Sequence, residues 1–152
     1  MGPSSTSSPT LKTSVPDVAA VYLNCGCPKH FSTHGGMGAN LLYTPALLCS
    51  ILIDMRQAAP PSVAVHAKIR LLPDQQDTLA LARATVRSNA VDCITVHCRT
   101  KDMRPREPAL PTRMREISEE IEKVGEGKVK VGCNGDAWDV DEALKIKEQT
   151  GE

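Results

Sequence analysis

The sequence is poor in aromatic side chains, in charge of one sign and in long apolar runs. Aromatic residues make up 3% of the 152 residues, so a surface that stacks bases on many rings is not expected. Lys and Arg number 18, as do Asp and Glu, and this balance leaves no global field to attract a polyanion. No apolar run approaches the length of a membrane span, so no membrane partner is expected. Any contact with nucleic acid must therefore use local basic clusters.

The cysteines lack the patterns of a disulfide framework or a zinc site. There are six: Cys25, Cys27, Cys49, Cys93, Cys98 and Cys133. No secretory signal precedes them, and no two of them form a C-x-x-C pair. We therefore expect reduced thiols in an intracellular protein, and no metal site.

Composition divides the chain into a tail and one domain. Residues 1–16 are rich in Ser, Thr and Pro and are predicted to be disordered. The rest, 17–152, is long enough for one folded domain. With 41% apolar and 24% charged residues, the chain has the composition of an ordinary globular protein.

Residues 17–152 alternate between strand and helix patterns. Strands are predicted at 18–24, 63–69, 91–97 and 128–133, and helices at 38–42, 45–56, 75–88, around 114–124 and after 139. The expected N-caps of the four longer helices are Thr44, Asp74, Thr112 and Asp139, the last with Glu142 in a capping box. This order predicts an α/β fold with a parallel sheet. Both a doubly wound sheet and about half of an eightfold (β/α) barrel satisfy it.

Polar residues gather at the carboxyl end of every predicted strand, the edge that carries active sites in both folds. They are Asn24 and Cys27, Lys68 and Arg70, His97 and Arg99, and Asn134, Gly135 and Asp136. Each has an ordinary structural interpretation when taken alone. Four strands that end in this way predict a functional site.

Four motifs resemble those of the tRNA-dihydrouridine synthases. They are Asn24-Cys25-Gly26-Cys27-Pro28 followed by His34-Gly35-Gly36-Met37-Gly38-Ala39, then Lys68-Ile69-Arg70, Val96-His97-Cys98-Arg99 and Asn134-Gly135-Asp136. Lys29-His30-Phe31-Ser32-Thr33 and Arg104-Pro105-Arg106-Glu107-Pro108 are similar to the eukaryotic type that acts at position 20 of tRNA. The sequence departs from the family at Tyr22, where an acidic residue is usual, and at Asn40.

This resemblance implies a cytoplasmic flavoenzyme that reduces a uridine of the tRNA D-loop. It implies about half of a TIM barrel that binds FMN, with NADPH as reductant. Cys27 would donate the proton to C5 of uracil. The remaining roles would be flavin binding by Lys68, His97, Asn134, Gly135 and Asp136, uracil binding by Asn24 and Arg70, and tRNA phosphate binding by Arg99, Lys101, Arg104 and Arg106.

Other interpretations stay open. The glycines and cysteines near residue 26 also suit a tight turn with a buried small side chain. Cys25 is interpreted as structural, with redox pairing to Cys27 as the alternative. The chain could be a non-catalytic α/β fragment or RNA-binding remnant, or part of another flavin-dependent barrel oxidoreductase. A half barrel has two exposed sheet edges, through which two copies could associate.

Overall fold

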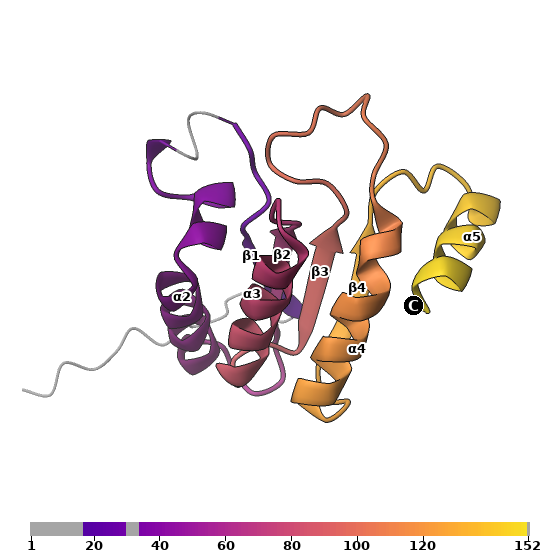
Figure 1. Cartoon of the computed structure of the whole chain (residues 1–152). Helices are drawn as coiled ribbons and strands as arrows, with labels where there is room; N and C mark the ends of the chain where they lie inside the picture. Colours follow the sequence, from indigo (N-terminus) through magenta and orange to yellow (C-terminus); the bar gives the residue numbers. More distant parts are fainter. Residues whose placement is uncertain (1–16, 30–33, 152) are drawn as a thin grey trace, which may run out of the picture.

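The computed structural model describes residues 17–29 and 34–151, which form four strands alternating with helices (Figure 1). In chain order, the elements are β1 (Ala20–Asn24), η1 (Gly38–Tyr43), α2 (Pro45–Ala58), β2 (Ala64–Arg70), α3 (Gln75–Arg87), β3 (Cys93–His97), η2 (Pro111–Arg113), α4 (Met114–Gly125), β4 (Lys130–Asn134) and α5 (Val140–Thr150). The predicted disordered tail at 1–16 lies outside the described residues, as do His30, Phe31, Ser32 and Thr33 of the motif at 29–33.

All four strands are parallel and lie in sequential order, which confirms the predicted α/β class. Right-handed crossovers between strands in this order place the helices on one face of the sheet. Figure 1 shows α2, α3 and α4 side by side on that face, and α5 beyond β4. A doubly wound sheet carries helices on both faces, so the arrangement is that of consecutive units of a barrel.

The core lies between the sheet and the helices. Alternate side chains of β2, namely Val65, Ala67 and Ile69, are fully buried on the helix side. Leu52 of α2 and Ile121 of α4 are equally buried against this layer. Each of the Val, Ile and Leu side chains contributes roughly 1.5–3 kcal/mol by leaving water. This period-two burial leaves the other side chains of β2 on the open face of the sheet.

Two of the predicted N-caps are confirmed. The Asp74 carboxylate accepts hydrogen bonds from the backbone N–H groups of Gln76 and Asp77, at 2.6 and 3.3 Å. Asp139 accepts from the N–H of Glu142 at 2.8 Å. The capping box is closed differently from the usual pattern, because the Glu142 carboxylate accepts from the N–H of Trp138 rather than of Asp139.

The other two predicted N-caps make no side-chain cap bond, and of these only Thr44 holds the N-cap position. Thr44 precedes α2, but its hydroxyl donates to the carbonyl of Leu41 at 3.4 Å and makes no cap bond. Thr112 lies inside η2, and α4 begins two residues later without a side-chain cap. In both places a short 3-10 helix precedes the α-helix: Thr44 is the residue that ends η1, and Thr112 lies within η2.

The sheet has two edges without a strand partner among the described residues, one at β1 and one at β4. Within 17–29 and 34–151, no helix has the length and apolar character needed to cross a lipid bilayer.

Candidate functional site

The parallel register collects the polar side chains of the open face into rows. Arg70 lies opposite His97, and His97 lies opposite Asn134, so these three form the row nearest the carboxyl ends of the strands. In the next row, two residues closer to the amino ends of β2 and β3, Asn24 lies opposite Lys68 and Lys68 lies opposite Thr95. Residues predicted separately at four strand ends therefore share one surface, which is the inner wall in a barrel.

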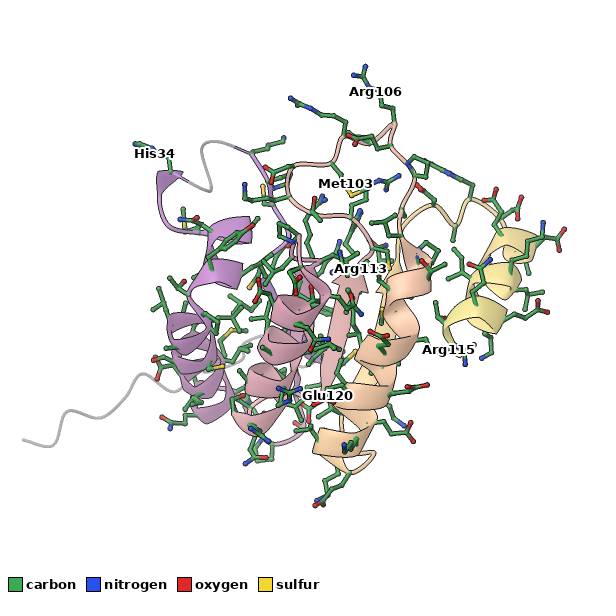
Figure 2. The ribbon with its side chains drawn as sticks, viewed as in Figure 1. His34, Met103, Arg106, Arg113, Arg115 and Glu120 are labelled. Atoms are coloured by element: carbon green, nitrogen blue, oxygen red, sulfur yellow. The ribbon has the colours of Figure 1, made fainter. Side chains whose placement is uncertain are left out.

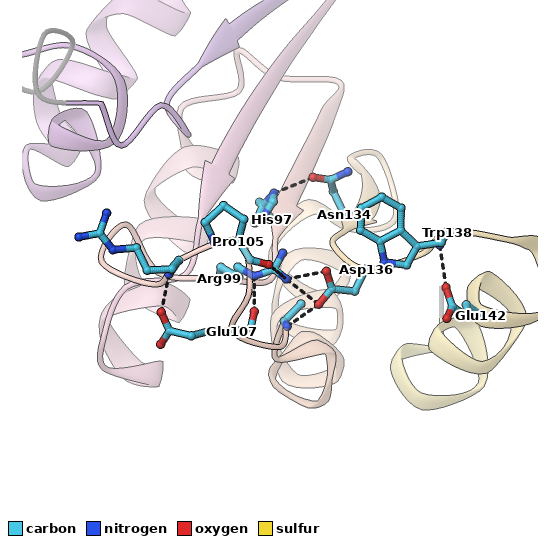
Figure 3. Close-up of polar contacts among 10 residues, drawn as sticks. His97, Arg99, Pro105, Glu107, Asn134, Asp136, Trp138 and Glu142 are labelled. Atoms are coloured by element: carbon cyan, nitrogen blue, oxygen red, sulfur yellow. Dashed lines mark hydrogen bonds and ion pairs between the residues drawn. The ribbon is translucent and has the colours of Figure 1, made fainter.

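His97 and Asn134 are joined by a hydrogen bond (Figure 3). The His97 Nδ1–H donates to Asn134 Oδ1 at 2.7 Å. Burial lowers the pKa of His97, and the nearby Arg70 cation lowers it further, whereas the bond to Asn134 opposes the shift. The imidazole is therefore neutral near pH 7, with its proton on Nδ1. Its Nε2 is a buried acceptor with no hydrogen-bond partner among the described residues.

Arg70 ties the loop after β1 to the loop after β3. Its Nε donates to the carbonyl of Gly26 at 2.6 Å, and its Nη1 donates to the carbonyl of Thr100 at 3.1 Å. Burial and the charge of Arg99 lower the pKa of Arg70, and the nearby Cys27 partly opposes that shift. A guanidinium has five N–H donors, and these two bonds leave others for a ligand.

Lys68 presents a half-buried ammonium group on the open face between Asn24 and Thr95. It makes no hydrogen bond or ion pair with residues 17–29 or 34–151. A cation in this position suits an acceptor group on a ligand. Asn24 has its amide oxygen occupied by the N–H of Gly26 at 3.0 Å, so its NH₂ remains as the donor.

The two neighbouring cysteines have different environments. Cys25 is fully buried, and burial raises the pKa of its thiol to about 12. Cys27 is only partly buried, and its carbonyl accepts from the N–H of Ala39 at the start of η1. Only Cys27 is therefore placed to meet a ligand, and the structural interpretation of Cys25 fits its burial.

Arg99 and Asp136 form an ion pair that builds the rim between β3 and β4 (Figure 3). The Arg99 Nη2 lies 2.5 and 2.7 Å from the two carboxylate oxygens of Asp136, and its Nε donates to the carbonyl of Glu107 at 2.7 Å. Arg99 is only 7% exposed. The geometry argues against Arg99 as a tRNA phosphate contact, because its charge is already paired and buried inside the loop that it was expected to present.

Gly135 links this rim to Asn134. Its φ is +138°, and a Cβ there would lie 3.1 Å from the Cβ of Ala109. The N–H of Ala109 donates to Asp136 at 2.7 Å, and with Arg99 this holds the pKa of the Asp136 carboxyl below its usual value. The Asp136 carboxylate is thus engaged in loop structure, and the backbone of Asn134–Gly135 is what remains for a cofactor.

The other predicted basic residues lie on the rim. Lys101 and Arg104 line a hollow of about 400 Å³ with Lys29, between the loops after β1 and β3. Arg104 and Arg106 are exposed, and Figure 2 shows Arg106 at the tip of its loop, directed away from the molecule. Lys101 pairs with Asp102 at 2.7 Å. This rim combines exposed cations with a concave surface.

Sequence reasoning missed His66. Its Nδ1 is buried without a hydrogen-bond partner among the described residues, and its ring meets Tyr22 edge-on, with ring centroids 4.5 Å apart. The signal was the period-two spacing of His66, Lys68 and Arg70, which places all three on the open face.

Comparison with known proteins identifies relatives over most of the chain. Residues 10–152 match the family model for dihydrouridine synthase (Dus). A tRNA-dihydrouridine(20) synthase [NAD(P)+] of Schizosaccharomyces pombe is 43% identical over 137 residues, which is 89% of this chain and 28% of that protein. Its counterpart in Saccharomyces cerevisiae is 44% identical over 105 residues, 68% of this chain and 27% of that protein.

A bacterial relative is also similar. The tRNA-dihydrouridine(16) synthase of Ralstonia nicotianae is 37% identical over 133 residues, 86% of this chain and 38% of that protein. The chain thus spans 27–38% of the length of these curated relatives. Because the family model covers nearly the whole chain, the protein belongs to the dihydrouridine synthase family.

Proposed function

We propose that this chain is part of an FMN- and NADPH-dependent enzyme that reduces a uridine of the tRNA D-loop to dihydrouridine. The observation that carries the proposal is the gathering of Arg70, Lys68 and His97 on one face of the sheet, with Cys27 in the loop whose Gly26 carbonyl binds Arg70. The relatives described above support the same activity, because all three are named tRNA-dihydrouridine synthases and two of the names include NAD(P)+.

The open face suits a flavin. The unpartnered Nε2 of His97 is an acceptor, and the Lys68 ammonium is a donor that lacks a partner among the described residues. An isoalloxazine ring offers the matching groups, an imide N–H between two carbonyls. Lys68, His97 and the backbone of Asn134–Gly135 would hold it, and Lys68 would face the negative charge that reduction brings.

Bound FMN, once reduced by NADPH, would supply the hydride for C6 of uracil. The Cys27 thiol would then donate its proton to C5, because it is the exposed member of the Cys25–Cys27 pair. Arg70 would stabilise the thiolate that remains, since its cation binds the carbonyl of Gly26, the residue before Cys27. The NH₂ of Asn24 would orient a uracil carbonyl.

Lys101, Arg104 and Arg106 would bind phosphates of the tRNA backbone. They belong to one rim loop, and two of them line the hollow with Lys29. Phosphate contacts of this kind position a nucleic acid without reading its sequence.

Replacement of Cys27 by Ala tests the proposal. The chain is incubated with FMN, NADPH and a tRNA transcript, and dihydrouridine is measured by mass spectrometry. We expect Cys27→Ala to lose about 10²–10⁴-fold in rate while flavin binding stays intact. An unchanged rate would remove Cys27 as the proton donor. Activity on a free pyrimidine but not on tRNA would favour another flavin-dependent oxidoreductase.

We further propose that two copies associate through the edges of β1 and β4, which have no strand partner among the described residues. Unpaired edges are templates for pairing. Size-exclusion chromatography should then show a dimer, and a monomer at every concentration would contradict the pairing. A cytoplasmic location follows from the resemblance alone and can be tested by fractionation.

A further inference from the structure

We propose that Cys98 and Cys133 form a reversible dithiol–disulfide site that exchanges with low-molecular-weight disulfides. The two sulfur atoms lie 3.4 Å apart, at the ends of the neighbouring strands β3 and β4. The proposed reduction of uridine uses neither thiol. All six cysteines are among the described residues, and none is in a disulfide.

The backbone holds the two thiols in contact. Cys98 continues the ladder beyond β3, because its N–H donates to the carbonyl of Asn134 at 2.8 Å. Cys133 lies opposite Val96 in the register, and Cys98 follows Val96 by two residues. The side chains of all three are therefore on the helix side of the sheet. Gly135 leaves room beside Cys98, since even a Cβ there would be 3.8 Å from the Cys98 Cβ. A disulfide needs a sulfur separation of about 2.05 Å, which is a short approach from the present contact.

The two thiols differ in access. Cys98 is fully buried, and its bond to Cys133, together with burial, raises the pKa of its thiol far above the ordinary value. Cys133 is only partly buried and lines a hollow of about 230 Å³ between β4 and α5. Lys147 and Thr150 line the same hollow. Cys133 is thus the thiol that a reagent meets first.

The reaction balances as two successive exchanges. The Cys133 thiolate attacks one sulfur of the disulfide RSSR, which breaks the S–S bond, forms a mixed disulfide and releases RS⁻. Cys98 then attacks the Cys133 sulfur, and the second RS group leaves with the Cys98 proton as RSH. The two cysteines are oxidised, and RSSR is reduced to two thiols.

The site adjoins the residues proposed to bind the flavin. Cys98 follows His97 directly, and Cys133 precedes Asn134 directly. His97 and Asn134 share a hydrogen bond of 2.7 Å. A disulfide between the adjoining cysteines would therefore change the geometry of that hydrogen bond. The dithiol site therefore places thiol oxidation next to the open face.

Titration of the full chain with mixtures of oxidised and reduced glutathione tests the proposal. After alkylation of the remaining thiols, tryptic peptides are analysed by mass spectrometry. Trypsin would release Cys93 and Cys98 together in the peptide 88–99, so the experiment uses a Cys93→Ala background. We expect a crosslink between 88–99 and 131–145, a loss of two hydrogen atoms from the intact mass, and a higher Tm that a thiol reductant reverses.

Two variants and one control complete the test. In the same background, Cys133→Ser should abolish the crosslink and the shift in Tm, whereas Cys49→Ala, which alters a thiol on α2, should leave both unchanged. If Cys133→Ser fails to fold, Cys98→Ala serves in its place. The proposal is overturned if the folded chain forms only mixed disulfides, or if the crosslink appears only after denaturation.

Discussion

At the scale of single residues, the glycine between Cys25 and Cys27 separates two thiols with different surroundings. Cys25 belongs to the core, and Cys27 lies beside Arg70 at the site. With the pKa of Cys25 raised to about 12, its thiolate fraction stays negligible at neutral and mildly alkaline pH. The pair therefore provides a reactive position and an inert one within three residues.

Alkylation by iodoacetamide should distinguish them. We expect Cys27 to react in the folded chain at pH 8, and Cys25 to react only when the chain unfolds, which peptide mapping over time can show. Cys25→Ser should also lower stability by about 1–3 kcal/mol, because it buries a hydroxyl in an apolar place, while Cys27→Ser should cost little. Equal alkylation rates for the two thiols would contradict this assignment.

The Arg99–Asp136 ion pair leads to a prediction about how stability depends on pH. The N–H of Ala109 and the charge of Arg99 hold the folded-state pKa of Asp136 below its ordinary value of 3.8. A depressed carboxyl pKa contributes stability that is present above 3.8 and lost as pH falls through the folded value. The Tm of the wild type should therefore fall more steeply below that pH than the Tm of Asp136→Asn.

At neutral pH, Asp136→Asn should cost about 1–3 kcal/mol, since it leaves the Arg99 guanidinium buried without its counter-charge. Lys101→Met, which breaks an ion pair with the exposed Asp102, provides the matched control and should leave stability nearly unchanged. Parallel pH profiles for wild type and Asp136→Asn would show that the pair does not act as described.

At the scale of elements, the helix N-termini separate what sequence patterns predict from what they do not. Asp74 and Asp139 cap α3 and α5 as their local sequences indicate, because each follows a turn that leaves its carboxylate unengaged. Thr44 and Thr112 have similar local patterns, yet a 3-10 helix occupies the preceding turn in both places. The sequence predicts the short helix at 38–42, but not that the Thr44 hydroxyl donates to the carbonyl of Leu41 in that helix.

Alanine substitutions at two of these positions should therefore differ. Asp74→Ala removes an acceptor of two backbone N–H groups and should cost about 1 kcal/mol in the free energy of unfolding. Thr44→Ala removes no cap bond and should stay within about 0.5 kcal/mol of the wild type. Chemical denaturation measures both free energies of unfolding. A larger cost for Thr44→Ala would show that the Thr44 side chain does cap α2.

At the scale of the whole molecule, the order of strands and helices was predictable, but the choice between a doubly wound sheet and a barrel was not. The structure decides it because α2, α3 and α4 cover one face only. The family fold is a TIM barrel, and this chain contains four consecutive strands of it. The open face therefore carries His66, Lys68 and Arg70, as the inner wall of a barrel does.

The placement of the candidate residues on one surface was predictable from the sequence, but their hydrogen bonds were not. Strand-end position was enough to place Lys68, His97 and Asn134 together, since parallel strands align their ends. The burial of Arg99 was not predictable, because its partner Asp136 is 37 residues away and the loop between them takes its shape from that contact. Contacts of this range depend on the packed fold rather than on local sequence.

Flavin binding by the open face can be measured directly. The purified chain is incubated with FMN and desalted, and its visible absorbance is compared with that of Lys68→Met and of the rim variant Arg106→Ala. The wild type and Arg106→Ala should retain a flavin band, and Lys68→Met should lose most of it, because the proposal places the Lys68 cation against the flavin. A wild-type chain without flavin, or equal retention by Lys68→Met, would contradict the assignment of the open face as the flavin site.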